Sequence, residues 1–458
     1  MNKFEILIPE MNLENLMQDS VLMRNAKKPT TKDKILDRAA FLLSQITYLM
    51  HNNDQGQLNG QVHLYSKILK SYVPDYHKYM KFFEKLDIVL ISNSYSTGNK
   101  YSKKYSLGPA VEGEKLKVYT LTNKRLIQKI RKQSFDPVAR KKYGYLLDMF
   151  HKLSVPEEYV PCKSKQNYVV EKQNFYPHQS ILVNKLNSNV DENWTFKIGA
   201  SGRLYNPISN LSKKIRPHLL YDGRYLLVEI DVKNSIPYFS IPLLRRNIIA
   251  RTPKLRRILI DSNPEVFTES YLDWWLRQDV SLAQDSKNYI AEVLDGKIYD
   301  QAAELWNNMM GKQYDRKSVK IPFLSVLNQP PTYLSKKRRI LTEEFPNVMK
   351  TVNTVNNGFI KTKNGEGENE WKEGDLRCPF AMFTQRAESW FILDVVCKKM
   401  HEKHPDCPIF SIHDALYTIP HYADILKKTM IEESERIFGA PLPVHVKDFA
   451  GSQDAKAA

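Results

Sequence analysis

The segment Phe410-Ser411-Ile412-His413-Asp414-Ala415-Leu416-Tyr417-Thr418-Ile419 decides how the second half of this chain folds. It consists of two short apolar runs of β-prone residues, separated by a single His-Asp pair. This pattern predicts a tight hairpin whose tip displays one carboxylate, Asp414. A carboxylate in that position can hold a metal ion, although an Asp in a turn is more often only a turn former.

A second carboxylate has a similar setting. Residues 225–230 have the pattern of a buried strand, and Asp231 follows them directly. Two Mg²⁺ ions roughly 3.5–4 Å apart need oxygen ligands on a rigid support, which strands provide. We therefore expect Asp231 and Asp414 to form a two-metal site, in which Mn²⁺ can substitute for Mg²⁺.

The composition points to a polyanionic partner. The chain has 458 residues and a formal net charge of +17, and its lysines and arginines are spread along the sequence. This charge predicts binding to nucleic acid before a membrane surface. The alternative is a basic soluble protein with no specific anionic partner.

The cysteines and the apolar segments favour a location in the cytoplasm of a bacterium or its host. None of the four cysteines has CxxC or zinc-type spacing, which indicates a reducing compartment. Residues 1–23 lack the apolar core of a signal peptide, and no stretch reaches the ~20 apolar residues that span a bilayer. We expect no membrane partner.

Residues 32–112 have the element order of a winged helix-turn-helix, a common DNA-binding module. The apolar spacing predicts three helices within 35–49, 64–69 and 76–86, followed by β-prone runs at 88–91 and 105–107 around a basic loop. The alternative is a small helical domain that binds a protein partner. The residues expected to face DNA are Lys67, Lys70, His77, Lys78 and Lys81, with Lys100, Lys103 and Lys104 on the wing.

The remaining sequence divides around this module. We expect an N-terminal extension (1–31), a basic helical connector (113–180) with a linker near 160–176, a body of mixed strands and helices (181–450) and a disordered tail (451–458). The fold class is therefore α+β. Helices are expected at Arg245–Ile260 with a break at Pro253, Leu282–Leu294, Ile298–Met310, Asp315–Leu327, Lys336–Phe345 and Pro379–Met400.

Within the body, five short motifs follow one another in a meaningful order. Ser201-Gly202-Arg203-Leu204 and Asn210-Leu211 precede Asp231-Val232-Lys233-Asn234-Ser235; Arg316 and Lys320 are four residues apart, and His413-Asp414 comes last. This order resembles the family A nucleic-acid polymerases, which include the single-subunit RNA polymerases of phages and mitochondria. The resemblance covers roughly Trp194 to Pro420 and implies a polymerase palm with helical fingers and thumb elements.

The resemblance also implies roles for individual residues. Asp231 and Asp414 stand where that family carries its catalytic metal ligands, in motifs A and C. Arg316 and Lys320 resemble the Arg-x3-Lys of motif B, and their spacing places both on one helical face, where they can meet a triphosphate. Further nucleotide-binding candidates are Ser235, Phe323 and Asn328, and candidates for binding template or primer are Arg203, Lys213, Lys214, Arg216, Gln385 and His413.

Two positions depart from the family pattern. Asn328 stands where motif B carries an aromatic residue on which the nascent base pair stacks, and Phe323 is the substitute that we expect. Ile236 stands where DNA-making members carry the glutamate that excludes a ribose 2′-hydroxyl. The choice between dNTPs and NTPs therefore stays open.

The sequence as a whole favours a template-directed nucleotidyltransferase, first of all a DNA polymerase of a phage, plasmid or other mobile element. Its partners would be a DNA template, a primer strand or nascent RNA, and nucleoside triphosphates. One alternative is a single-subunit-type RNA polymerase or primase-like enzyme. Others are a catalytically inactive DNA-binding replication initiator, and a two-metal nuclease or transposase that also uses Glu388.

Overall fold

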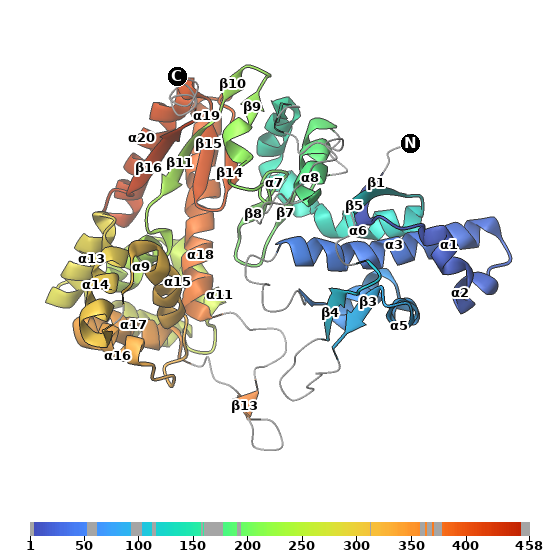
Figure 1. The fold of residues 1–458 in the computed structure, drawn as a ribbon. Coiled ribbons are helices and arrows are strands. Elements are labelled where there is room, and N and C mark those ends of the chain that lie inside the picture. The colour runs from blue at the N-terminus through green and yellow to red at the C-terminus, as the bar shows by residue number, and fades with distance from the viewer. Residues whose placement is uncertain are drawn as a thin grey trace. The chain divides into compact units, whose positions relative to one another are not determined.

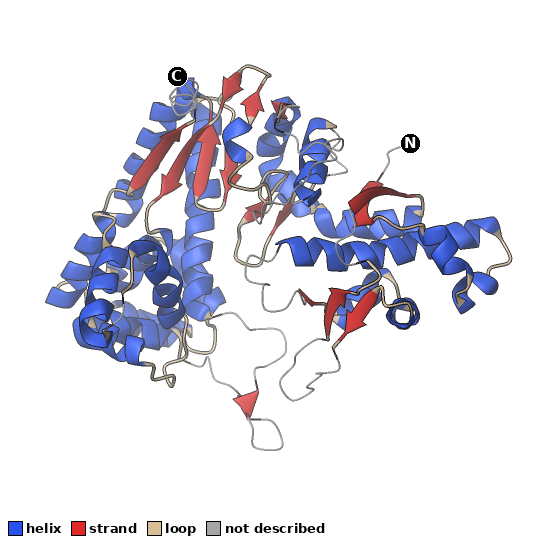
Figure 2. Cartoon of the chain, viewed as in Figure 1, coloured by secondary structure: helices blue, strands red, loops and turns tan. Residues whose placement is uncertain are grey.

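The chain has an α+β fold. A computed structural model describes residues 4–52, 62–92, 103–111, 116–156, 159, 177–189, 194–311, 313–357, 362–363, 369–370 and 378–449. Helices make up most of its secondary structure (Figure 2). The chain divides into two compact units, one comprising Met1–Lys142, Leu153–Lys197 and Asn210–Leu219, and the other comprising Tyr143–Lys152, Ile198–Ser209 and Leu220–Ala458.

The first unit is built around a long helix, α3 (Pro29–Asn52), which packs against an antiparallel pair of strands, β1 (Phe4–Pro9) and β5 (Leu116–Leu121). The carboxylate of Asp37 on α3 is buried and accepts hydrogen bonds from Tyr119 Oη (3.1 Å) and Thr122 N (2.7 Å). A buried carboxylate needs such donors, so this contact fixes α3 to the end of β5. The other helices of this unit are α1 (Leu13–Gln18), α2 (Val21–Arg24), α6 (Lys124–Ser134) and α8 (Pro177–Asn187).

The segment predicted as a winged helix contains the three expected helices and the two expected strands in order, and also β2 (Val62–His63), which the sequence did not predict, between the first two helices. After α3 come β2, α4 (Ser66–Tyr72), α5 (Tyr76–Lys85), β3 (Val89–Ile91) and β4 (Lys104–Leu107), and the strands form a sheet in the order β2-β4-β3. Most of the predicted wing loop, with Lys100, and the predicted linker near 160–176 lie outside the described residues. The winged helix itself stays a prediction, and so do the domain bounds.

The second unit contains a four-stranded antiparallel sheet in the order β14-β15-β11-β16 (Figure 1). Its strands are Phe410–Ile412, Ala415–Thr418, Val228–Val232 and Val444–Asp448, respectively. Ile412 pairs with Ala415, so β14 and β15 form the predicted hairpin, with His413 and Asp414 as its turn. His413 adopts a left-handed backbone conformation (φ 58°), as two-residue hairpin turns require.

Helix α20 (Pro420–Phe438) packs against strands β11 and β15 of this sheet. The helices between β11 and the hairpin are α9 (Ser235–Leu244), α10 (Arg246–Arg251), α11 (Pro253–Ser262), α12 (Glu269–Leu276), α13 (Gln284–Leu294), α14 (Ile298–Met310), α15 (Arg316–Leu327), α16 (Lys336–Glu344), α17 (Pro346–Val355), α18 (Pro379–Ser389), the π-helical η5 (Trp390–Cys397) and α19 (Lys398–Lys403). These bounds confirm the helices that the apolar spacing predicts, including the break before Pro253.

Shorter elements complete the chain. One boundary between the two units falls inside α7 (Pro137–Asp148). The others are the 3₁₀ turns η1 (Met149–Lys152) and η4 (Arg216–His218), and the strands β6 (Leu153–Ser154), β7 (Lys197–Ile198), β8 (Leu204–Tyr205), β9 (Leu220–Tyr221), β10 (Tyr225–Leu226), β12 (Thr362–Lys363) and β13 (Asn369–Glu370).

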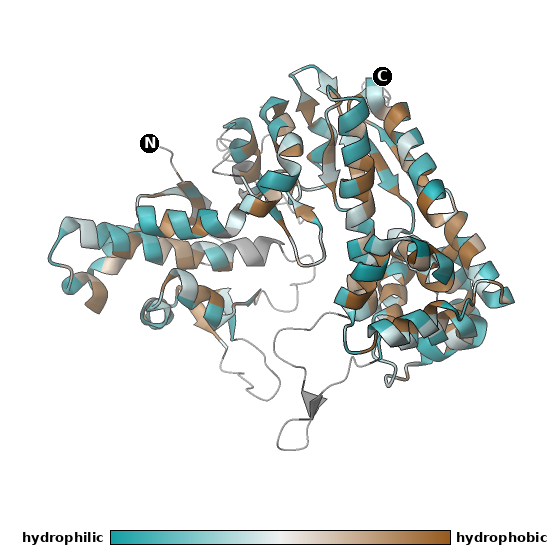
Figure 3. Cartoon of the chain, turned by 180° about the vertical axis from the view of Figure 1, so that it is seen from behind, coloured by the Kyte–Doolittle hydropathy of each residue, from teal (hydrophilic) through white to brown (hydrophobic). Residues whose placement is uncertain are grey.

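An aromatic cluster lies at the centre of the second unit. The rings of Phe239 on α9, Phe391 on η5 and Phe438 on α20 have centroids 5.4–5.9 Å apart. Hydrophobic and hydrophilic residues alternate along the helices (Figure 3), as expected where one face of each helix is buried. This core holds α9, which begins directly after β11, and therefore fixes the segment that follows Asp231.

Candidate active site

Of the two predicted metal-binding aspartates, Asp231 lies on β11, and Asp414 lies in the neighbouring β14–β15 hairpin turn. Asp231 on β11 pairs across the strands with Ala415, the residue directly after Asp414. Burial, and after it the negative charge of Asp414, raises the pKa of Asp231. Burial also raises the pKa of Asp414. Two carboxylates that repel each other are stabilised by any cation that arrives between them.

The donor set fits a hard divalent cation. Two carboxylates are the usual protein contribution to a Mg²⁺ site, where waters and substrate phosphates supply the other oxygen ligands. Within the described parts of the chain, no group of three or more His, Cys, Asp or Glu residues is arranged to hold a metal.

Strand β16 brings a cation to this pair. Lys447 pairs in register with Glu229, and its ammonium group forms an ion pair with the Glu229 carboxylate. The same ammonium nitrogen lies 3.7 Å from Asp231 Oδ2. The other Glu229 carboxylate oxygen accepts a hydrogen bond from the hydroxyl of Tyr417. Glu229 is therefore neutralised locally, which leaves Asp231 and Asp414 as the carboxylates available to a metal.

Arg203 is held by a buried glutamate. Glu388 on α18 is fully buried and accepts hydrogen bonds at Oε1 from Arg203 Nε (2.8 Å) and Nη2 (2.7 Å). Ser235 at the start of α9 donates to its other oxygen, Oε2 (2.5 Å). Burial, and next the charge of Asp414, raises the pKa of Glu388 to about 7, while Arg203 and Ser235 counteract that shift. Glu388 thus joins the loop of residues 199–203, here called the Arg203 loop, to the segment after Asp231.

The Arg203 loop fits closely against α18. Gly202 has φ 80°, and a Cβ atom built on it would lie 3.3 Å from the Ser389 Cβ. Arg386 Nε donates to Ala200 O (3.3 Å), and Ser389 Oγ donates to Ser201 O (3.3 Å). Glycine is required here both by the backbone conformation and by the close approach of the helix.

Arg316 and Lys320 lie on α15, which starts with a capping box formed by Asp315 and Ser318. Arg316 Nη1 donates to Gly296 O (2.8 Å) and also bonds to Asp300, while Nη2 donates to Asn234 Oδ1 (3.2 Å). Lys320 is exposed, and its positive charge lowers the pKa of both Asp231 and Asp414 against the effect of their burial. The charge of Lys320 thus acts on both aspartates, while Arg316 is held by Asn234, three residues after Asp231.

Other predicted site residues are placed as follows. Phe323 is buried and packs edge-on against Tyr299, with ring centroids 5.5 Å apart, so its ring is engaged in the core. Asn328 is the C-terminal cap of α15. Gln385 lies on α18, and the His413 ring packs edge-on against Tyr205 (5.8 Å between centroids).

The remaining predicted nucleic-acid contacts belong to the first unit, whereas all the residues described above belong to the second. Lys67, Lys70, His77, Lys78, Lys81, Lys103, Lys213 and Lys214 are exposed, and Lys104 and Arg216 are half-buried. Arg216 Nε donates to Leu211 O (2.9 Å). Their roles stay predictions.

Sequence reasoning missed Glu229, Asn234 and Lys447 as members of this site. The alternation in Val444-His445-Val446-Lys447-Asp448 is a signal for a strand. It does not tell which strand is the neighbour, and only the pairing of β16 with β11 places Lys447 beside Glu229.

Comparison with known proteins identifies no family. No protein-family description and no curated protein sequence matches this chain. Among solved structures, the chain is weakly similar to the polymerase domain of Pol1 from M. smegmatis in complex with DNA primer-template and dNTP. The identity is 14%, the match covers 59% of this chain and 50% of that chain, and the TM-score is 0.29.

Proposed function

We propose that the second unit is the catalytic body of a template-directed nucleotidyltransferase, and first of all of a DNA polymerase. The observation that carries this proposal is the position of Asp231 on β11 beside the β14–β15 hairpin turn that carries Asp414, with the charge of Lys320 acting on both carboxylates. A carboxylate pair that faces cations on a helix suits chemistry in which metal ions and a triphosphate meet.

In this proposal, Asp231 and Asp414 hold two Mg²⁺ ions. When bound, such ions activate the attacking hydroxyl and stabilise the charge of the leaving group. Arg316 and Lys320 bind the triphosphate, and Arg316 is already oriented by Gly296 and Asn234. The primer 3′-oxygen bonds to the α-phosphorus, the bond to the bridging oxygen breaks, and pyrophosphate leaves; the hydroxyl proton passes to solvent.

The chain's other features support nucleic acid as the substrate. Its net charge is +17, and exposed lysines lie on α4 and α5 of the first unit. None of the helices that the structure describes has the length and the apolar composition needed to cross a membrane. We infer that the partners are a DNA template and a primer strand or nascent RNA.

Nucleotide incorporation tests this proposal. Labelled dNTPs and NTPs are offered separately on primed and unprimed DNA and RNA templates, with Mg²⁺ or Mn²⁺. We expect incorporation by the wild type, and a loss of roughly a hundredfold or more in Asp231→Asn and Asp414→Asn. The control is Asp222→Asn, at a turn with φ 53° where Asn is equally tolerated, and it should keep wild-type activity.

The outcomes of this assay test the enzyme proposal, the site assignment and the class of polymerase separately. If the wild type incorporates nothing under any of these conditions, the enzyme proposal fails. If the two aspartate variants stay active, the site assignment fails. Incorporation of NTPs on unprimed template would identify an RNA polymerase or primase-like enzyme instead of a DNA polymerase.

One observation favours a second proposal, a catalytically inactive DNA-binding initiator. Phe323 is buried against Tyr299, and Asn328 occupies the position at which the resemblance expects a stacking aromatic. A chain without a stacking surface for the nascent base pair can keep the fold and lose the reaction. Specific DNA binding without incorporation would support this reading.

A further inference from the structure

Asn234 is a buried residue for which neither the sequence nor the proposed mechanism gives a role. It lies between β11 and α9, is 5% exposed and has a left-handed backbone conformation (φ 53°), which Asn tolerates better than most residues. Its Oδ1 accepts a hydrogen bond from Arg316 Nη2 (3.2 Å). Because a guanidinium group only donates, the atom that faces it must be the carbonyl oxygen, which fixes the orientation of the amide.

The other half of this amide has no partner among the residues that the structure describes. Asn234 Nδ2 is buried and finds no hydrogen-bond acceptor in the described part of the chain. Buried donors in folded proteins are nearly always paired, so an orphan of this kind calls for an acceptor that the described residues do not supply.

The surroundings of Asn234 indicate what that acceptor is. A Cβ atom built on Gly296 (φ 78°) would lie 3.8 Å from Asn234 Nδ2 and 3.3 Å from Lys233 Cδ, so glycine leaves space between the amide and the lysine stem. The neighbours are two cations, Lys233 and Arg316, and the N-terminus of the ten-residue helix α9, which has no side-chain cap. Cations and a helix N-terminus favour an anionic oxygen.

We propose that Asn234 is a triphosphate-binding residue that also positions Arg316: its carbonyl oxygen orients the guanidinium, and its Nδ2 donates to a phosphate oxygen of the bound nucleotide. This inference rests on the proposed function, because it assigns the ligand of the same site. The exposed side chain of Lys233 borders the amide, and it moves aside to let the phosphate reach Nδ2. Asp300 and Gly296 also bind Arg316, so that arginine keeps two of its partners when Asn234 is replaced.

The test is the binding of inorganic tripolyphosphate, measured by calorimetry on the full chain. Asn234→Asp keeps the shape of the side chain and the acceptor for Arg316 but removes the donor. Asn234→Gly removes the donor without adding charge, and glycine tolerates the positive φ. We expect both variants to bind tripolyphosphate about tenfold more weakly than the wild type, since each lacks a hydrogen bond to a charged group.

A matched control separates this effect from backbone conformation and charge. Asn189 in the first unit has nearly the same left-handed conformation (φ 57°), and Asn189→Asp should bind tripolyphosphate like the wild type. Thermal unfolding of each variant checks that it is folded, and if Asn234→Asp does not fold, Asn234→Gly decides the matter.

Two results would overturn the inference: a wild type that does not bind tripolyphosphate, or a folded Asn234 variant whose dissociation constant stays within about twofold of the wild type. Failure of the proposed function has a different signature. If tripolyphosphate binds and the Asn234 variants weaken it, but no nucleotide is incorporated, the phosphate site stands and the polymerase proposal falls.

Discussion

At the scale of single residues, the site is organised by one buried carboxylate. Glu388 has no exposed surface, yet its two oxygens serve three donor groups from two other segments of the chain. Burying a charge is costly unless it is paired and hydrogen-bonded, and here Arg203 and Ser235 meet that requirement. The arginine that the resemblance assigns to nucleic acid is thus also part of the internal structure.

Replacing this carboxylate should destabilise the protein strongly. In Glu388→Ala, the guanidinium of Arg203, which is 21% exposed, loses its counterion, so the free energy of unfolding should fall by about 3–5 kcal/mol. Urea denaturation measures this change. Glu402→Ala is the control, because its ion pair with Lys398 is exposed on both sides, and it should cost about 0.5 kcal/mol or less. Equal losses in the two variants would contradict the role of Glu388.

Two glycines allow the strain at the Arg203 loop to be separated from its packing. Gly223→Ala should cost about 1–2 kcal/mol for its positive φ alone, because nothing lies within 4 Å of the added Cβ. Gly202→Ala adds a close contact with Ser389 and displaces the loop, so its loss of unfolding free energy should be clearly larger. Chemical denaturation of both variants provides the comparison. If they lose the same amount, the loop is not tightly fitted against α18.

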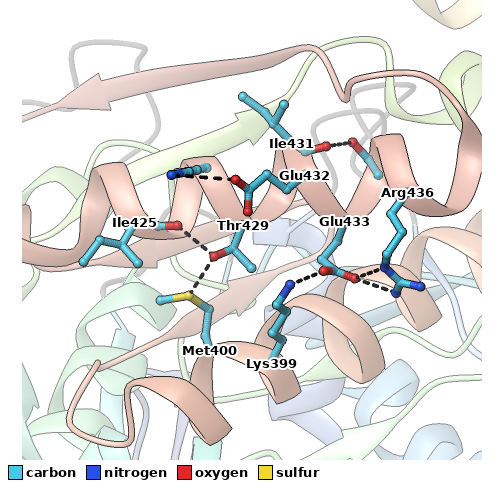
Figure 4. A network of polar contacts seen from close by, with 10 residues as sticks. Lys399, Met400, Ile425, Thr429, Ile431, Glu432, Glu433 and Arg436 are labelled. Atoms are coloured by element: carbon cyan, nitrogen blue, oxygen red, sulfur yellow. Dashed lines mark hydrogen bonds and ion pairs between the residues drawn. The ribbon is translucent and has the colours of Figure 1, made fainter.

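At the scale of secondary-structure elements, ion pairs connect α19 and α20, two helices near the C-terminal end of the second unit. Glu433 on α20 is buried and pairs with Lys399 on α19 and with Arg436 one turn further on (Figure 4). Arg436 Nε and Nη2 donate to Glu433 Oε2 (2.9 and 2.6 Å). Nearby, Thr429 Oγ1 donates to Ile425 O (2.9 Å) and contacts Met400 Sδ. This network fixes α20 against the helix that follows η5.

The same network should make stability depend on pH. Burial would raise the pKa of Glu433, but the hydrogen bonds from Arg436 and Lys399 outweigh it and lower the pKa below its ordinary value. The native state therefore binds fewer protons than the unfolded state. The stability that Glu433 contributes is fully present above the ordinary pKa of its carboxyl group, and it is lost as the pH falls through the lower pKa of the native state. Glu433→Gln should cost about 1–3 kcal/mol near pH 7 and less at acidic pH.

Urea denaturation of wild type and Glu433→Gln over a series of pH values tests this expectation. The exposed pair of Lys428 and Glu432 on the same helix offers Glu432→Gln as a control with little effect at any pH. A difference between wild type and Glu433→Gln that does not change with pH would show that the charge of Glu433 is not what stabilises α20.

At the scale of the whole molecule, the net charge is +17, and both units of the chain carry exposed lysines. If the proposed function is right, DNA binding should weaken steeply with salt, because each phosphate that is neutralised contributes about −0.9 to the slope of log K against log salt. Replacing Lys67, Lys78 and Lys81 by Gln should reduce the steepness of that slope by roughly 2–3.

Fluorescence anisotropy on duplex DNA at several salt concentrations measures this slope. The control is the replacement of Lys398, Lys403 and Lys428, three exposed lysines of the second unit, which changes the net charge equally. If both triple variants keep the wild-type slope, α4 and α5 do not contact phosphates. If both reduce it equally, net charge and not a specific surface is responsible.

The sequence alone determined the local elements of this protein. Apolar spacing is a property of neighbouring residues, so it predicted α14 at its observed bounds and the break before Pro253. The β-prone runs on either side of His413-Asp414 predicted the hairpin for the same reason. The order of the motifs along the chain suggested that Asp231 and Asp414 belong together, but it could not say how.

Only the tertiary structure decided the contacts that make the site. The register between β11, β15 and β16 places Asp231 beside the hairpin turn and Lys447 beside Glu229. The packing of α18 against α9 brings Glu388 to Arg203 and Ser235. Strand pairing and helix packing join residues far apart in sequence, and a slip of one residue would turn each side chain to the other face of the sheet. No local pattern contains that information.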